Sequence, residues 1–176
     1  MSESLPWSHP LRWAELQRGT RVLSLVADAE TLARIAKALD LEAAKSLSAD
    51  LTLQPWLDGI RIDGRVEGVV TRICGVSLEP FDESVDEPLA VRIVPAGSSN
   101  APAAAGAEVI IDPAADDPPD VQEGDVVDLG AYVVEHLALA LDPFPRKPGA
   151  VFEPPPGGEP PSPFAVLARL KTPRED

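Results

Sequence analysis

The fold is decided by two neighbouring stretches, SLSADLTL at residues 46–53 and IRIDGRVEGVV at residues 60–70. In both, apolar side chains recur at every second position, which is typical of strands with one buried face. The residues expected to face the core are Leu47, Ala49, Leu51 and Leu53 in the first stretch and Ile60, Ile62, Val66 and Val70 in the second. Gly64 and Gly68 are expected at bends or bulges. The turn-like sequence LDG at residues 57–59 predicts that the two strands form a hairpin.

Three further segments are expected to extend this sheet. Residues 20–26 and 85–94 form separate strands, the second with a register break near Pro88, and residues 69–78 continue or follow the second strand of the hairpin. Short connections favour antiparallel neighbours. The predicted fold class is therefore α+β, with a mostly antiparallel, barrel-like sheet of about five to seven strands.

Two main helices and a short C-terminal helix are predicted to accompany the sheet. Asp28 can cap a helix that ends at Asp40 or Leu41 and covers one sheet face. Asp128 can cap a more buried helix over residues 129–141, where apolar residues recur at helical spacing. Ser162 followed by Pro163 is typical of a helix start, because proline lacks only an N–H that the first turn does not use.

Length and composition fit one domain over residues 1–176, with residues 95–107 and 143–161 expected to be irregular or flexible. The longest apolar stretch, residues 133–141, is too short to span a bilayer. Residues 1–10 carry acid and proline instead of a basic region followed by an apolar run, so no secretory signal is expected. The expected location is the cytoplasm.

The charge is unevenly distributed along the chain. Up to Arg72 there are 9 Lys and Arg against 10 Asp and Glu, and after it 6 against 19, within a net charge of −14. A field of this sign repels phosphate, which disfavours unassisted binding to RNA or DNA. A basic protein is the natural complement, and residues 108–128 carry 8 acids and no Lys or Arg.

Catalytic groups are scarce in the sequence. The histidines are His9 and His136, and His136 is expected at a helix edge with its ring satisfied. Cys74 is expected in a strand as a buried structural thiol whose pKa is not lowered, although pairing with a histidine as a nucleophile stays open. There is no glycine-rich phosphate loop, and residues 116–128 lack the spacing of a calcium loop. We therefore expect no catalytic residue, cofactor or metal.

Three stretches in order resemble a known protein family. They are TRICGVSLEP at residues 71–80, EGDVVDLGAYVVEHLALAL at residues 123–141 and PFAVLARLK at residues 163–171. Their order and spacing are similar to those of the YceD or DUF177 proteins, whose bacterial members are called large ribosomal RNA subunit accumulation proteins. The motif residues assigned a structural role, mostly in the core, are Cys74, Leu78, Pro80, Leu129, Leu137, Pro163, Phe164 and Leu167.

The resemblance implies a non-enzymatic role in the synthesis, processing or stability of 23S, the large-subunit ribosomal RNA. Many members of the family carry Cys-x-x-Cys in the first motif, whereas this chain has Ser77 where the second cysteine would fall. That difference removes a metal or redox role for Cys74 in this chain.

The acidic half suggests how such a role could be performed. We expect a surface that binds a basic large-subunit ribosomal protein or an assembly factor, so that contact with rRNA is indirect and no membrane or small-molecule substrate is involved. The candidate partner-binding residues are Arg72, Glu79, Asp82, Glu83, Asp116, Asp117, Asp120, Glu123, Asp125, Asp128 and Glu135, with Asp86 and Glu87 on the same surface. Asp128 can equally be only a helix cap.

Two other classes of function remain open. A small hydrolase would use clustered carboxylates such as Asp125, Asp128 and Glu135, brought together in a cleft. A direct RNA-binding module would need an exposed basic and aromatic stripe. The only candidates for that stripe are Arg61, Arg65 and Arg72 with Trp56.

Overall fold

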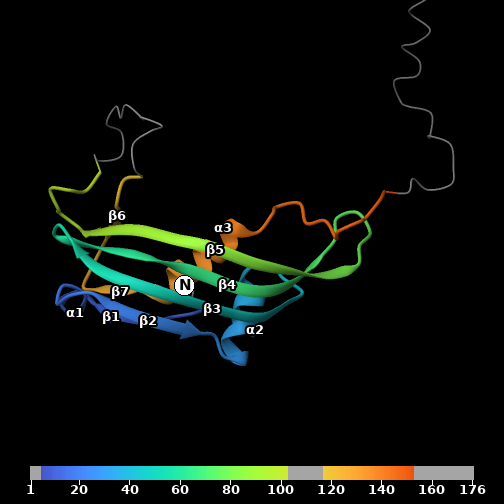
Figure 1. The fold of residues 1–176 in the computed structure, drawn as a ribbon, viewed down its shortest axis with the longest axis horizontal. Helices are drawn as coiled ribbons and strands as arrows, with labels where there is room; N and C mark the ends of the chain where they lie inside the picture. Colours follow the sequence, from blue (N-terminus) through green and yellow to red (C-terminus); the bar gives the residue numbers. More distant parts are fainter. Residues whose placement is uncertain (1–4, 103–116, 153–176) are drawn as a thin grey trace, which may run out of the picture.

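A five-stranded sheet in the order β2-β3-β4-β5-β6 forms the framework of the protein (Figure 1). The computed structural model describes residues 5–102 and 117–152. In chain order the elements are β1 (Pro10–Arg12), α1 (Trp13–Leu16), β2 (Arg21–Val26), α2 (Ala29–Ala38), β3 (Ala43–Trp56), β4 (Gly59–Ile73), β5 (Pro80–Pro95), β6 (Asp120–Gln122), β7 (Val126–Asp128) and α3 (Leu129–Ala140). β1 and β7 pair separately as a two-stranded sheet.

The predicted hairpin is confirmed as β3 and β4, both longer than the sequence pattern indicated. All eight residues expected to face the core are buried. The expectation of bends or bulges at Gly64 and Gly68 is wrong, because both pair in regular register and the irregularity lies between Ala44 and Ser46. A Cβ atom at Gly64 would lie 2.3 Å from the carbonyl oxygen of Asp50. Glycine is present there because the neighbouring backbone approaches too closely for a side chain.

The register break expected near Pro88 is also absent, since β4 and β5 pair continuously from Ile60 with Ile93 to Ile73 with Pro80. The reason lies in the direction of the peptide groups. The backbone carbonyl of Glu79 accepts a hydrogen bond from the N–H of Cys74, so it points toward β4. Because the direction of the peptide groups alternates along a strand, the N–H and C=O groups of the even-numbered residues of β5 point away from β4. Pro88 therefore has its missing N–H on the open side of β5, where a strand tolerates proline.

The fold class is α+β as predicted, but the prediction of a barrel-like, mostly antiparallel sheet is wrong. The sheet is open and mixed, because β6 pairs with β5 in parallel over three residues. Parallel neighbours require a long connection, and β6 begins 25 residues after the end of β5.

One continuous core lies between the sheet and the two longer helices. Asp28 caps α2 by accepting a hydrogen bond from Thr31 N, and Asp128 caps α3 from Ala131 N, as the sequence predicted. α2 ends earlier than expected, at Ala38, with Asp40 at a φ of 52° beyond it. The more buried helix is α3, as predicted, and its core side chains include Leu129, Val133 and Leu137. The predicted C-terminal helix lies outside the described residues.

Candidate protein-interaction surface

Four of the five acids on and beside β5 that the sequence assigned to a partner are paired within the chain. These four form ion pairs with a Lys or Arg of another segment: Glu79 with Lys147 at 2.8 Å, Asp82 with Lys45 at 2.6 Å, Glu83 with Arg72 at 3.0 Å, and Asp86 with Arg65. Glu87, the fifth, forms no ion pair with a described Lys or Arg. The pKa values of Glu79, Asp82 and Asp86 are lowered by hydrogen bonds from these bases. These carboxylates are therefore locally neutralised and present less free charge than the sequence suggested.

Arg72 ties three segments of the molecule together. Its guanidinium donates to Glu83 Oε2 at 3.0 Å and to the carbonyl oxygen of Asp142, beyond the end of α3, at 2.6 Å. Its side chain is only 12% exposed. The geometry accounts for Arg72 as a link between β4, β5 and the segment that follows α3.

The arginines proposed as an RNA-binding stripe are engaged in the same way. Arg61 forms two hydrogen bonds with Asp63, at 2.7 and 2.8 Å, and Arg65 is held by Asp86. Trp56 lies under the guanidinium of Arg92, 5.3 Å from the ring centroid. The arginines of this stripe are thus bound by carboxylates, and Trp56 is covered by Arg92, which lies outside the proposed stripe.

A second set of acids lies in and near a hollow between β6, β7 and α3. The hollow has a volume of about 400 Å³, and Asp120, Asp128 and Glu135 line it together with Tyr132. We use the term acidic rim for Asp120 on β6, Glu123 and Asp125 in the turn between β6 and β7, and Glu135 on α3. All four side chains are exposed. Within residues 5–102 and 117–152, none of the four forms an ion pair with a Lys or Arg.

Asp128 lines the same hollow but has a structural role. Its carboxylate accepts hydrogen bonds from the Ser8 hydroxyl at 2.5 Å, the His9 N–H at 2.8 Å and the Ala131 N–H at 3.3 Å. It therefore caps α3 and fastens the N-terminal segment beside β1. Since Asp125 does not line the hollow, the carboxylate cleft of the hydrolase hypothesis is not assembled as that hypothesis required.

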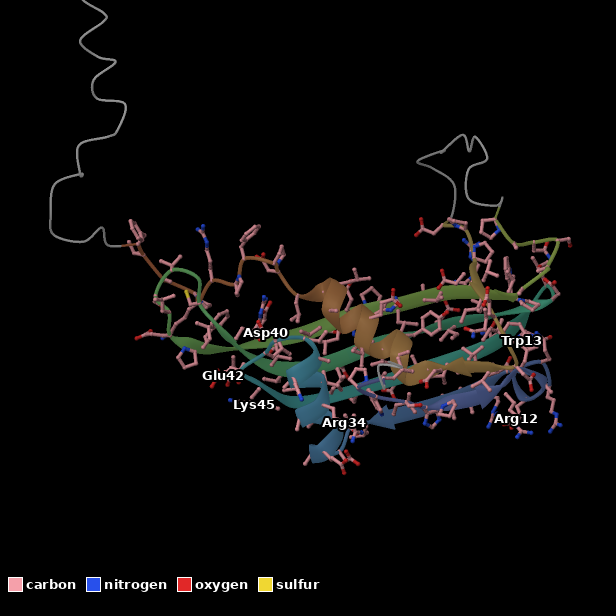
Figure 2. The ribbon with its side chains drawn as sticks, turned by 180° about the vertical axis from the view of Figure 1, so that it is seen from behind. Arg12, Trp13, Arg34, Asp40, Glu42 and Lys45 are labelled. Carbon is pink, nitrogen blue, oxygen red and sulfur yellow. The ribbon has the colours of Figure 1, made fainter. Side chains whose placement is uncertain are left out.

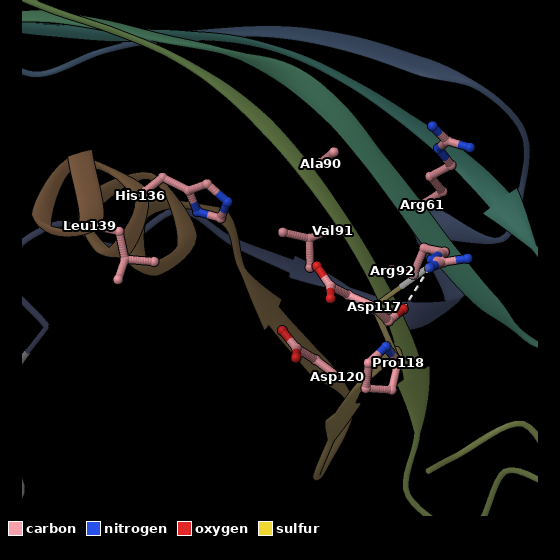
Figure 3. Close-up of a pocket in the computed structure, with 9 residues that line it drawn as sticks. All are labelled: Arg61, Ala90, Val91, Arg92, Asp117, Pro118, Asp120, His136 and Leu139. Atoms are coloured by element: carbon pink, nitrogen blue, oxygen red, sulfur yellow. Dashed lines mark hydrogen bonds between the residues drawn. The ribbon is translucent and has the colours of Figure 1, made fainter. Parts of the chain in front are cut away.

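A neighbouring hollow of about 530 Å³ contains both charge types (Figure 3). There Arg92 donates to the Asp117 carbonyl at 2.5 Å, and Asp120 lines this hollow as well as the acidic one. His136 faces it, with Nδ1 2.9 Å from the Tyr132 carbonyl, so the predicted satisfied ring is confirmed. Sequence reasoning missed Tyr132, whose pKa is raised by burial and by the charge of Asp120; its place one turn before His136 was the available signal.

Cys74 differs from the expectation in two respects. It follows β4 in a turn instead of lying in a strand, and its Sγ accepts backbone N–H groups from Val76 and Ser77, at 3.4 Å, and from Lys147, at 3.3 Å. Hydrogen bonds from Ser77, and then from Lys147, lower its pKa to about 6. The side chain is buried, as expected for a structural thiol, but the expectation of an unlowered pKa is wrong.

The remaining motif residues fall into three groups. Leu129 and Leu137 are buried in the core. Leu78, which was expected there, is 76% exposed at a φ of 58°, and Pro80 is also exposed. The motif residues Pro163, Phe164 and Leu167, and the candidate acid Asp116, lie outside the described residues.

In the described part of the chain, no group of three His, Cys, Asp or Glu side chains is arranged to hold a metal ion, and no helix is long and apolar enough to cross a membrane. Searches among curated proteins and among solved structures returned no match. A family model described as "Large ribosomal RNA subunit accumulation protein YceD" matches residues 62–171, which include most of β4, all of β5, the acidic rim and α3. The match covers more than half of the chain, and the chain therefore belongs to the YceD family, which is named for the accumulation of large-subunit ribosomal RNA.

Proposed function

We propose that this protein supports the synthesis, processing or stability of 23S ribosomal RNA without catalysing a reaction, by binding a basic ribosomal protein or assembly factor in the cytoplasm. The family assignment supports a role in accumulation of the large-subunit RNA. The acidic rim is the part of the surface to which we assign the partner. Contact with RNA is then made through the partner, whose charge has the opposite sign.

The observation that carries this proposal is the contrast between two sets of acids. The carboxylates of Glu79, Asp82, Glu83 and Asp86 each have a Lys or Arg of the same chain beside them. None of the four carboxylates of the acidic rim forms an ion pair with a Lys or Arg among the described residues, although Asp120 shares a hollow with Arg61 and Arg92. A group of like charges without counter-charges raises the local potential and favours a ligand that brings the missing cations. Lys and Arg side chains of a ribosomal protein provide such cations.

Binding of this kind would protect the partner before assembly. A Lys/Arg-rich chain attracts any nucleic acid non-specifically, through displacement of counterions from phosphate. An acidic surface occupies the same side chains reversibly, and rRNA, with its higher charge density, can displace it. The complex should therefore be sensitive to salt, because exposed charges are screened over about 8 Å at physiological ionic strength.

The proposal can be tested with the proteins extracted from purified large ribosomal subunits. The immobilised full-length chain is exposed to this mixture, and the retained proteins are quantified at several salt concentrations. In the test variant the acidic rim is neutralised by Asp120→Asn, Glu123→Gln, Asp125→Asn and Glu135→Gln. We expect the wild type to retain one or a few basic proteins. The variant should bind them about tenfold more weakly, because each of the four exposed charges contributes a few tenths of a kcal/mol to binding.

The matched control removes the same number of charges elsewhere, through Asp40→Asn, Glu42→Gln, Asp50→Asn and Glu67→Gln. These four side chains are exposed. Figure 2 shows Asp40 and Glu42 well apart from Trp13, whose backbone N–H donates to the backbone carbonyl of Asp125. The control should bind like the wild type. Equal loss in both variants would indicate a general charge effect, and unchanged binding in the rim variant would refute the assignment.

A further inference from the structure

The two edges of the sheet differ in character, because β6 covers only Ile93–Pro95 of β5 and leaves the rest of that strand open. β2 is a terminal strand, and in Figure 1 it follows the lower boundary of the ribbon, away from β5 and β6. Its sequence, RVLSLV, contains no acid and no proline. On the open side of β5, Pro80 and Pro88 instead lack the N–H groups that a pairing strand would need. Charges and proline are the means by which proteins prevent unwanted strand pairing, so the edge at β5 is protected and the edge at β2 is not.

The hydrogen-bonding groups of β2 can be assigned to its two sides. Ala27 N donates to Leu47 O of β3 at 2.9 Å, and by alternation the odd-numbered residues of β2 bond to β3. Val22, Ser24 and Val26 therefore direct their N–H and C=O groups away from the sheet. Among the described residues, no backbone hydrogen bond joins these groups to another segment. The side chains of Val22 and Val26 are each 74% exposed, on the face opposite the core.

We propose that β2 is a self-association edge, to which a second copy of this chain adds its own β2 in antiparallel orientation. A two-fold axis at Ser24 places Val22 opposite Val26 of the second copy, and Val26 opposite its Val22. Each copy then offers three N–H and three C=O groups in matching positions, which gives about six ladder hydrogen bonds. Paired β-branched side chains across antiparallel strands add to the stability of the joint.

The absence of acidic residues on β2 favours a second copy of the chain over a basic protein as the partner at this edge. A net charge of −14 opposes association unless the two acidic regions stay apart. β2 lies in the nearly balanced part of the sequence, on the opposite side of the sheet from β5 and β6. Pairing through β2 therefore places the β5 and β6 edges of the two copies, with Asp82, Asp86 and Asp120, at opposite outer edges of the joined sheet. A Lys/Arg-rich partner has no carboxylate on β2 to bind.

The dimer is expected to be weak. One added strand of six residues is at the lower end of specific interface areas, below about 1,200 Å², so association is expected at micromolar or higher concentrations. Analytical ultracentrifugation of the full-length chain from about 1 µM to 1 mM should show a concentration-dependent shift from monomer to dimer. The double variant Val22→Lys and Val26→Lys should stay monomeric, because edge lysines oppose strand pairing. The control Leu139→Lys changes an equally exposed apolar residue on α3 and should dimerise like the wild type.

Cross-linking tests the geometry independently of stability. With Ser24→Cys the two new thiols face each other across the axis, with Cα atoms about 5.5 Å apart, a separation that a disulfide accepts. The native Cys74 is buried and does not compete. Mild oxidation should link most of this variant as a dimer, whereas Ser84→Cys on the open edge of β5 should remain monomeric. A wild type that is monomeric at every concentration, a dimer that persists in the lysine variant, or equal cross-linking through Ser84→Cys would overturn the proposal.

Discussion

The Sγ atom of Cys74 accepts a hydrogen bond from the backbone N–H of Lys147, 3.3 Å away, and so connects the β4–β5 turn to the segment that follows α3. Close to this bond, Gly75 N donates to Pro145 O at 2.9 Å, and Lys147 Nζ pairs with Glu79 at 2.8 Å. The turn is thus fastened to a distant part of the chain by several polar contacts. Because the acceptor is sulfur, its protonation state controls the strength of one of them.

The lowered pKa of Cys74 predicts a specific dependence of stability on pH. The folded value is about 6, against an ordinary value of 9.0, because the N–H groups around Sγ favour the thiolate. A lowered pKa means that the unfolded chain binds more protons between these two values. The stabilisation is therefore fully present above about pH 9 and is lost as the pH falls through about 6.

This pH dependence can be measured by urea unfolding of the wild type and of Cys74→Ala from pH 5.5 to 9.5. The difference in the free energy of unfolding between them should grow as the pH is raised. Cys74→Ser should behave like the alanine variant, since a hydroxyl does not ionise in this range. A difference that stays constant with pH would show that the thiolate does not form in the folded protein.

Replacing Arg72 is predicted to destabilise the fold. Arg72→Ala leaves Glu83 and the Asp142 carbonyl without their donor in a site where the arginine side chain is 12% exposed. Loss of hydrogen bonds to a charged group in such a place costs about 1.5–3 kcal/mol. Thermal unfolding measures the effect, with Arg65→Ala as control, because the pair of Arg65 with Asp86 is exposed. Similar losses in both variants would contradict the structural role of Arg72.

Gly64→Ala is predicted to destabilise the sheet. The added Cβ would lie 2.3 Å from the Asp50 carbonyl and 2.8 Å from a methyl group of Leu51, so β3 and β4 must separate locally. Overpacking of this kind costs about 1–3 kcal/mol. Gly75→Ala is the control, since its nearest neighbour would be 3.6 Å away. A Gly64 variant as stable as the Gly75 variant would show that the strands are not so closely spaced.

Leu78→Asn is predicted to stabilise the protein. Leu78 has a φ of 58°, a left-handed conformation that costs a leucine about 1–2 kcal/mol and that asparagine adopts more readily. Its side chain is exposed, so little packing is lost. Leu139→Asn, on an equally exposed residue of α3, should give no gain, because asparagine is a poorer helix former. A loss of stability in the Leu78 variant would indicate that its side chain has a packing role.

The parts of the fold that local patterns specify were predictable from the sequence. Alternating burial along residues 46–53 and 60–70 identified the hairpin, and the carboxylates of Asp28 and Asp128 identified both helix starts. Pro88 and Gly64 were misinterpreted because their effects depend on which side of a strand faces a neighbour. The parallel pairing of β6 with β5 follows from a long connection and leaves no periodic signal.

The candidate surface was only partly predictable, for a related reason. The sequence shows that acids are abundant after Arg72, but the bases that neutralise them come from distant segments, such as Lys45 for Asp82 and Lys147 for Glu79. The lowered pKa of Cys74 has the same origin, since one of its donors is 73 residues away. The folded structure was needed to separate paired acids from the acidic rim.

The most direct test of the central claim is the ratio of large-subunit to small-subunit rRNA in cells that lack this protein. The cells are complemented with the wild type, with the variant neutralised at the acidic rim, or with the control neutralised at Asp40, Glu42, Asp50 and Glu67, all at equal expression. We predict a low ratio without the protein, restored by the wild type and the control but not by the rim variant. Full restoration by the rim variant, or an unchanged ratio in cells without the protein, would contradict the account.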